Sequence, residues 1–120
     1  ALDVFAAQQS RFDELEGTWL VSEQRLSLPG AVWLPEVGRG RLSDIMQRYL
    51  EDNLTRVTAG NRDRALLVYC VADCWMSWNA AQRIAGLGYS RVYWFRLGTD
   101  GWLDIGETLA PVDPVPVDVD

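Results

Sequence analysis

The amino-acid sequence predicts an α/β fold with a mainly parallel central sheet flanked by helices. Short apolar segments of strand length alternate with two segments in which apolar residues recur at helical spacing. This alternation is typical of domains in which helices cover a parallel sheet. The length of 120 residues and the 48% hydrophobic content suit one domain with a modest core.

The first part of the chain contains short strand-like pieces. Residues 1–5 (ALDVF) predict a buried strand, and residues 6–17 are polar enough for a loop or a weak helix. Residues 18–22 alternate apolar and polar side chains and predict a minor strand. A turn at Pro29–Gly30 then leads into a brief strand over residues 31–34.

After Ser43 the apolar residues change to a helical period. Ser43 and Asp44 are placed to cap the first turn of this helix, and Gly60 is expected to end it. The residues at helical spacing are Ile45, Met46, Tyr49, Leu50 and Leu54.

Residues 65–70 (ALLVYC) form a continuous apolar run, as expected of a central strand covered on both faces. Ser77 is the predicted N-cap of the helix that follows, and Gly86 or Gly88 is expected to end that helix. Its predicted buried stripe consists of Trp78, Ala81, Ile84 and Ala85.

The last part of the chain predicts one more strand, over residues 91–95, and a turn at residues 98–102 (GTDGW). Residues 111–120 carry proline and aspartate where a core would need apolar clusters, which predicts an extended, mobile tail. We therefore expect one domain over residues 1–110 and a mobile C-terminal tail over residues 111–120.

Composition excludes several classes of function. The net charge of −6 argues against nucleic-acid binding, in which a basic surface supplies most of the affinity. All eleven basic residues are arginine, so the chain has neither the imidazole of a Ser-His-Asp or Cys-His site nor a lysine for a Schiff base. No apolar run approaches the ~18–20 residues of a membrane span.

Both cysteines, Cys70 and Cys74, lie in one loop between the central strand and the second helix. Ligands of parallel sheets gather at the carboxyl ends of strands, where Cys70 is placed. Two cysteines without histidine are too few for a zinc site, so we expect no metal and no cofactor. The alternatives to a reactive sulfur are a buried core cysteine and a strained redox disulfide between the two.

The loop after Cys70 predicts an anion site. Backbone amides at a helix N-terminus stabilise a thiolate, and the same amides would hold an anionic substrate or a persulfide. Asp73 opposes this role, and no basic residue lies between Cys70 and Ser77. Trp75 is the side chain expected to contact a ligand or a partner. The candidate substrate-binding residues are Val71, Ala72, Asp73, Trp75, Met76 and Ser77.

Two other motifs carry weaker signals. Residues 38–41 (GRGR) lack the spacing and the lysine of a phosphate loop, so a solvated turn is the simpler interpretation. The alternative is that Arg39 or Arg41 reaches an anion held by a neighbouring loop. Asp100 and Asp104 have the residue type of an acid/base pair, but turn and helix-cap roles account for both.

Several segments together resemble the rhodanese-like domains. They are LDV at residues 2–4, LPGAVWLP at 28–35, LLVYC at 66–70, AAQRIAGLGYSRVYWF at 80–95 and GTDGW at 98–102. More narrowly, YCVADCWMSWNAAQR at 69–83 is similar to a cysteine-pair-tryptophan subgroup associated with catabolism that depends on pyrroloquinoline quinone. The resemblance spans nearly the whole chain and lacks only an upstream strand and helix and an export signal.

The resemblance implies that Cys70 takes the place of the sulfur-carrying cysteine. Rhodanese-like enzymes move a sulfane sulfur from a donor such as thiosulfate or a persulfide, through a cysteine persulfide, to a thiophilic acceptor. The subgroup resemblance further implies a periplasmic protein that accompanies quinoprotein alcohol oxidation, with a quinoprotein dehydrogenase or a cytochrome as partner. No quinone-binding residues carry over.

The loop departs from the family pattern in charge and length. Val71 and Met76 stand where a basic residue is common, Asp73 stands near the usual glycine, and the path from Cys70 to Ser77 is one residue longer than usual. Phosphatase relatives with a longer loop use an arginine, which Met76 cannot replace.

Three functions follow from the sequence. The first is sulfur transfer, with Cys70 as nucleophile and Cys74 resolving the persulfide. The second is a thiol–disulfide couple formed by Cys70 and Cys74. The third is a non-catalytic module in which Trp75 and its loop dock onto a quinoprotein or cytochrome.

Overall fold

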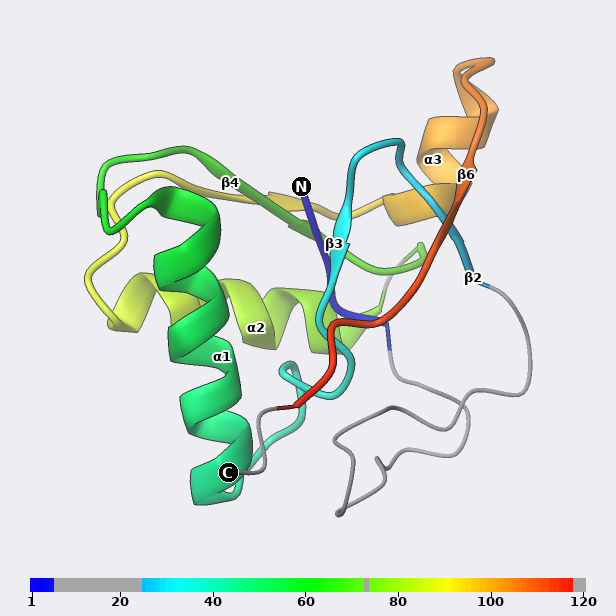
Figure 1. Ribbon diagram of the computed structural model, residues 1–120. Coiled ribbons are helices and arrows are strands. Elements are labelled where there is room, and N and C mark those ends of the chain that lie inside the picture. Colours follow the sequence, from blue (N-terminus) through cyan, green and yellow to red (C-terminus); the bar gives the residue numbers. More distant parts are fainter. Residues whose placement is uncertain (6–24, 73, 118–120) are drawn as a thin grey trace.

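A computed structural model describes residues 1–5, 25–72 and 74–117 of the chain (Figure 1). Within these ranges four parallel strands form the central sheet, in the order β3-β1-β4-β5. They are β1 (Leu2–Asp3), β3 (Val32–Trp33), β4 (Leu66–Tyr69) and β5 (Val92–Phe95). The predicted α/β fold with a parallel sheet is confirmed. The strand and the polar segment predicted within residues 6–22 lie outside the described residues.

Two longer helices connect strands of this sheet. They are α1 (Asp44–Thr58), between β3 and β4, and α2 (Trp75–Gly86), between β4 and β5. Both connections are parallel crossovers that step across the sheet in the same direction, and such crossovers are right-handed. Both helices therefore lie on one side of the sheet, as Figure 1 shows. None of the helices in the described ranges is long and apolar enough to cross a membrane.

The caps of α1 lie close to where the sequence predicts them. The hydroxyl of Ser43 accepts a hydrogen bond of 3.2 Å from the backbone N–H of Met46, which satisfies one of the unpaired amides of the first turn. The helix ends at Thr58, and Ala59 adopts a left-handed conformation at the C-cap.

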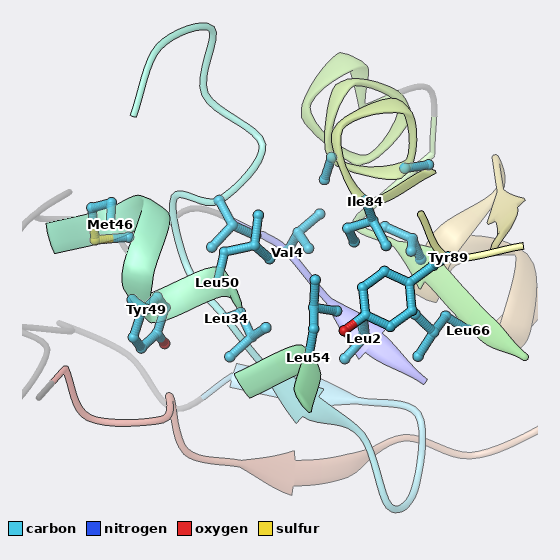
Figure 2. Packing of buried hydrophobic residues seen from close by; sticks show 14 of the residues in the cluster. Leu2, Val4, Leu34, Met46, Tyr49, Leu50, Leu54, Leu66, Ile84 and Tyr89 are labelled. Atoms are coloured by element: carbon cyan, nitrogen blue, oxygen red, sulfur yellow. The ribbon is translucent and has the colours of Figure 1, made fainter. Parts of the chain in front are cut away.

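The core lies between the sheet and the two helices (Figure 2). Side chains along a strand alternate between the two faces, so Leu66 and Val68 of β4 point toward the helices. Cys70 continues this alternation one step beyond the strand and is likewise buried in the core. Helical residues that pack against it from α1 and α2 include Leu50, Leu54, Ala80 and Ile84.

The opposite face of the sheet carries buried polar groups. The hydroxyl of Tyr69 shares a hydrogen bond of 2.5 Å with that of Ser27, from β2 (Arg25–Ser27). The carboxylate of Asp3 pairs with Arg25 at 2.7 Å. Burial, the largest cause, raises the pKa of Tyr69 to about 12, so this phenol stays protonated. Polar bonds thus tie the second face to β2.

Residues 111–117 differ from the mobile tail that the sequence predicts over residues 111–120, of which 118–120 lie outside the described residues. Residues Ala110–Val112 form β6, which pairs antiparallel with β2. The Val115 N–H then donates a hydrogen bond of 2.9 Å to the carbonyl of Trp33, and the Val117 side chain is 3% exposed. The side chains of Val115 and Val117 pack against the core.

Residues 98–102 also differ from the predicted turn, because they form most of the short helix α3 (Gly98–Asp104).

The helix α2 begins earlier than predicted. It starts at Trp75, two residues before the predicted cap Ser77, and Cys74 is its N-cap. Ala81 and Ile84 are buried as predicted, but Ala85 is exposed and Trp78 is 48% exposed. Its ring packs against that of Trp94 on the edge strand β5, with centroids 6.4 Å apart.

Candidate functional site

The two cysteines occupy the two ends of the loop between β4 and α2. Cys70 directly follows β4 and is fully buried, whereas Cys74 is partly exposed at the N-cap of α2. Both are free thiols. A buried sulfur and an accessible sulfur are therefore placed side by side at the carboxyl end of a central strand, where parallel sheets bind ligands.

The sulfur of Cys74 is stabilised as a thiolate. It accepts a hydrogen bond from the thiol of Cys70 and further bonds from the backbone amides of Ser77, Met76 and Val71. These bonds, that of Cys70 being the strongest, lower the pKa of Cys74 from 9.0 to about 6, against an opposing contribution from burial. At neutral pH Cys74 is consequently ionised to a large extent.

The pKa of the buried Cys70 is shifted in the opposite direction. Its pKa is raised, first because its S–H donates to Cys74 and second because burial disfavours a charged sulfur. The two thiols thus share one ionisation: Cys74 carries the negative charge and Cys70 keeps its proton.

This arrangement differs from the amide cradle that the sequence predicts around Cys70. Among the described residues the Val71 amide is the one that bonds the Cys70 sulfur, whereas the first-turn amides of α2 are directed at Cys74. The physical reason is the early start of the helix. Since α2 begins at Trp75, the residue at its N-cap, next to the unpaired amides, is Cys74.

The other candidate binding residues are placed as follows. The amide of Ala72 is already used, because it donates a hydrogen bond of 2.8 Å to the Asp100 carboxylate. Trp75 is 57% exposed beside Cys74, as its predicted contact role requires. Ser77 is buried, and its hydroxyl donates a hydrogen bond of 2.8 Å to the carbonyl of Cys74. Asp73 lies outside the described residues.

The start of α3 braces the backbone of Cys70, which sequence reasoning missed. The Thr99 N–H donates to the carbonyl of Cys70 at 3.1 Å. Gly98 lies so near that a Cβ there would come within 2.4 Å of the same carbonyl oxygen, and its φ of +57° is one that favours glycine. The glycine and aspartate of GTDGW were the sequence signal for this contact. The contact could be inferred from them only with the knowledge that β5 lies next to β4 in the sheet.

The segment Glu36–Arg41 also reaches the site. The Arg39 guanidinium is close enough to Cys74 that the thiolate helps to raise the pKa of the arginine, after the larger effect of its hydrogen bond to Glu36. The solvated turn expected at residues 38–41 is thus packed on the site. Among the described residues no cluster of histidine, cysteine and acidic side chains is arranged to hold a metal ion.

A family model described as the rhodanese-like domain matches residues 8–105, which is most of the chain. The chain belongs to the rhodanese-like domain family. The parallel sheet with helices, and a cysteine directly after the central strand β4, are consistent with this membership. No curated protein and no solved structure gives a significant match. The family membership predicted from the sequence is confirmed.

Proposed function

We propose that this rhodanese-like domain transfers sulfane sulfur through a persulfide on its cysteine pair, and that Cys74 is the attacking sulfur. The observation that carries the proposal is the Cys74 thiolate at the start of α2, stabilised by first-turn amides and by the Cys70 thiol. A thiolate is the reactive form of cysteine, and this one is also the accessible member of the pair. Family membership supports a sulfurtransferase-type role.

The first step is attack on a sulfur donor such as thiosulfate. The Cys74 thiolate forms a new S–S bond to the sulfane sulfur, the S–S bond of thiosulfate breaks, and sulfite leaves with the electron pair. The persulfide that remains on Cys74 is anionic at its outer sulfur. The amides of α2 and the Cys70 S–H supply hydrogen bonds suited to that charge.

The second step returns the thiolate. An acceptor thiolate attacks the outer sulfur of the persulfide and takes it, and Cys74 leaves as the thiolate stabilised by the same amides. Alternatively, the Cys70 sulfur attacks the inner sulfur of Cys74, so that an intramolecular disulfide forms and hydrogen sulfide leaves. That branch needs an external thiol reductant to restore the pair.

Cys74 takes the role that the sequence assigns to Cys70. Cys70 is fully buried and its pKa is raised, so attack by its sulfur requires both exposure and loss of a proton. Its place in the family pattern nevertheless makes it the competing nucleophile, and the experiment must separate the two.

The test is intact mass spectrometry after incubation of the protein with thiosulfate, without reductant. We expect Cys70→Ser to gain the mass of one sulfur atom and Cys74→Ser to gain none. The wild type is expected to show the same gain, or a loss of two hydrogens with release of sulfide. A gain that requires Cys70 and survives in Cys74→Ser would reverse the assignment of the attacking sulfur. If neither the wild type nor either variant gains sulfur or releases sulfide, the sulfur-transfer proposal is wrong.

A thiol–disulfide couple is the second candidate. Hydrogen bonding between the two free sulfurs favours it, because one is a ready thiolate and the other lies within its reach. Oxidation by glutathione disulfide in the absence of a sulfane donor tests this role. Loss of two hydrogens in the wild type, and a mixed disulfide on Cys74 in Cys70→Ser, are expected of a redox couple.

We also propose, on the motif of residues 69–83 alone, a periplasmic role beside quinoprotein alcohol oxidation. The partner would be a quinoprotein dehydrogenase or a cytochrome, and exposed Trp75 and Trp78 next to Cys74 would contact it. Co-purification of a haem or quinone protein from periplasm, lost in Trp75→Ala, is the expected result. Capture that does not depend on Trp75 would contradict this contact.

A further inference from the structure

The site contains a cation that the loop between the cysteines does not supply. No basic residue lies between Cys70 and Ser77, and the chain as a whole carries a net charge of −6. The Asp100 carboxylate is bonded to the same loop through Ala72. The net negative charge opposes the approach of an anionic sulfur donor, so a positive group held near Cys74 would favour its binding.

The segment Glu36–Arg41 is locked onto the N-terminal half of α2. Gly38 lies against the backbone of Met76, where a Cβ would come within 2.1 Å of the carbonyl oxygen. The side-chain amide of Asn79 donates to the carbonyls of Gly38 and Arg39 at 3.0 and 3.1 Å. Arg83 donates to the carbonyls of Val37 and Gly40, at 2.6 and 3.0 Å. These contacts fix the position of the segment relative to Met76, two residues after Cys74.

Within this segment Glu36 orients Arg39. The Nε of Arg39 donates to one carboxylate oxygen of Glu36 at 2.5 Å, and Nη2 approaches the other at 3.4 Å. Glu36 adopts a φ of +72°, a left-handed conformation that costs a residue other than glycine about 1–3 kcal/mol. A strained backbone of this kind persists only where surrounding contacts hold it, and the bonds to Arg39 are among those contacts.

The exposure of the pair is unequal. The Glu36 side chain is 11% exposed and that of Arg39 is 41% exposed. The charge that a dissolved ligand meets is accordingly the guanidinium, while the carboxylate lies behind it. The guanidinium also interacts electrostatically with the Cys74 sulfur. A planar guanidinium is suited to sulfonate and phosphate oxygens as well as to carboxylates.

We propose that Arg39, oriented by Glu36, binds the oxyanion end of the sulfur donor beside Cys74, so that the site selects donors such as thiosulfate over uncharged sulfane compounds. The inference rests on the proposed sulfur transfer and names the class of its substrate. Arg39 supplies from another segment of the chain the positive charge that residues 70–77 lack.

Alkylation of Cys74 by a charged and an uncharged reagent tests the position of this charge without any sulfur transfer. Iodoacetate and iodoacetamide react with the same thiolate, so the ratio of their rates cancels the thiolate fraction and reports the local potential. We expect Arg39→Gln to lower the ratio of iodoacetate to iodoacetamide by about five-fold or more, as loss of one nearby unit charge implies. Arg39→Lys should retain most of the ratio.

Arg41→Gln is the matched control, because Arg41 is an exposed arginine of the same segment. In Arg41→Gln the ratio of the iodoacetate rate to the iodoacetamide rate should fall by less than half as much as in Arg39→Gln. An equal fall in both variants, or no fall in either, overturns the inference. Arg39→Met keeps the apolar stem of the side chain and serves as the second neutral variant if Arg39→Gln does not fold.

Sulfur loading from two donors then tests selection by Arg39 separately from sulfur transfer itself. Thiosulfate is the anionic donor and dimethyl trisulfide the uncharged one; at the central sulfur of the trisulfide the Cys74 thiolate displaces methanethiolate and gains an S–S–CH3 group, which is the mass to be followed. Arg39→Gln should load more slowly from thiosulfate and be unchanged with the trisulfide after correction for the thiolate fraction. Equal slowing with both donors would contradict selection by charge. Failure of the wild type to load from either donor would contradict the proposed function, while the alkylation ratio would still decide whether Arg39 acts on the site.

Discussion

The indole Nε1 of Trp94 donates a hydrogen bond of 2.8 Å to the hydroxyl of Ser77. The same hydroxyl donates one of 2.8 Å to the carbonyl of Cys74. The edge strand β5 is thereby joined to the N-cap of α2 through a single buried oxygen. The position of the accessible sulfur depends on this oxygen, although Ser77 itself contributes only an amide to the sulfur.

Ser77→Ala is expected to lower the free energy of unfolding by about 1–3 kcal/mol, because the Trp94 N–H and the Cys74 carbonyl both lose a partner. Urea denaturation followed by tryptophan fluorescence measures this change. Ser90→Ala is the matched control, since Ser90 is exposed and its hydroxyl bonds only neighbouring surface groups. A loss in Ser77→Ala no larger than that in Ser90→Ala would mean that the relay contributes nothing.

The pKa of Cys74 should depend on the hydrogen bond from Cys70. The rate of iodoacetamide alkylation against pH is expected to rise with an inflection near 6 in the wild type. Cys70→Ala removes the donor, so the inflection should move toward the ordinary value of 9.0. Cys70→Ser keeps a hydrogen-bond donor at the same position, so the inflection should move less in this variant. Identical profiles for the alanine and serine variants would exclude the hydrogen bond as the main cause.

The same ionisation links stability to pH. Folding lowers the pKa of Cys74 from 9.0 to about 6, so the unfolded chain binds more protons between these values. The stability that this group contributes is therefore fully present above pH 9 and is lost as pH falls through about 6. The difference in unfolding free energy between the wild type and Cys74→Ser should grow with pH across this interval. A difference that stays constant would contradict the lowered pKa.

Much of the fold follows from local signals. The central strand, the cap at Ser43 and the helical spacing of α1 are determined by residues close together in sequence, and the structure has them as predicted. Trp78 is different. A large aromatic residue at core spacing predicts burial, but Trp78 packs against Trp94 of the edge strand β5 and remains 48% exposed.

The site was predictable in its residues and less so in its geometry. The loop, the thiols and the helix N-terminus are visible in the sequence. Which sulfur receives the amides depends on an N-cap that lies at Cys74, three residues earlier than the predicted cap Ser77. The role of Arg39 depends on its electrostatic interaction with Cys74, 35 residues later in the chain. That of Asp100 depends on a hydrogen bond to Ala72, 28 residues earlier. No local pattern encodes such interactions.

A methyl group at Gly38 should disturb both the segment and the helix. Gly38→Ala is expected to lower the free energy of unfolding by about 1–3 kcal/mol or more, since the contacting atoms belong to the backbone of Met76 and cannot move aside cheaply. Gly40→Ala is the matched control in the same segment, because a Cβ at Gly40 meets no atom within 4 Å. Equal stability of the two variants would show that residues 36–41 do not pack on α2 as described.

The order of the C-terminal segment depends on a side chain from α1. The buried Tyr49 hydroxyl donates a hydrogen bond of 2.7 Å to the carbonyl of Val115, whose own N–H donates to Trp33. Tyr49→Phe keeps the ring in the core and removes this bond, at a cost of about 0.5–1.5 kcal/mol. Hydrogen exchange of the Val115 amide should therefore become faster relative to amides of β4. Tyr93→Phe, at an exposed position on β5, should leave that ratio unchanged. If the Val115 amide exchanges as fast as a free peptide in the wild type, the segment is mobile, as its proline and aspartate content alone predicts.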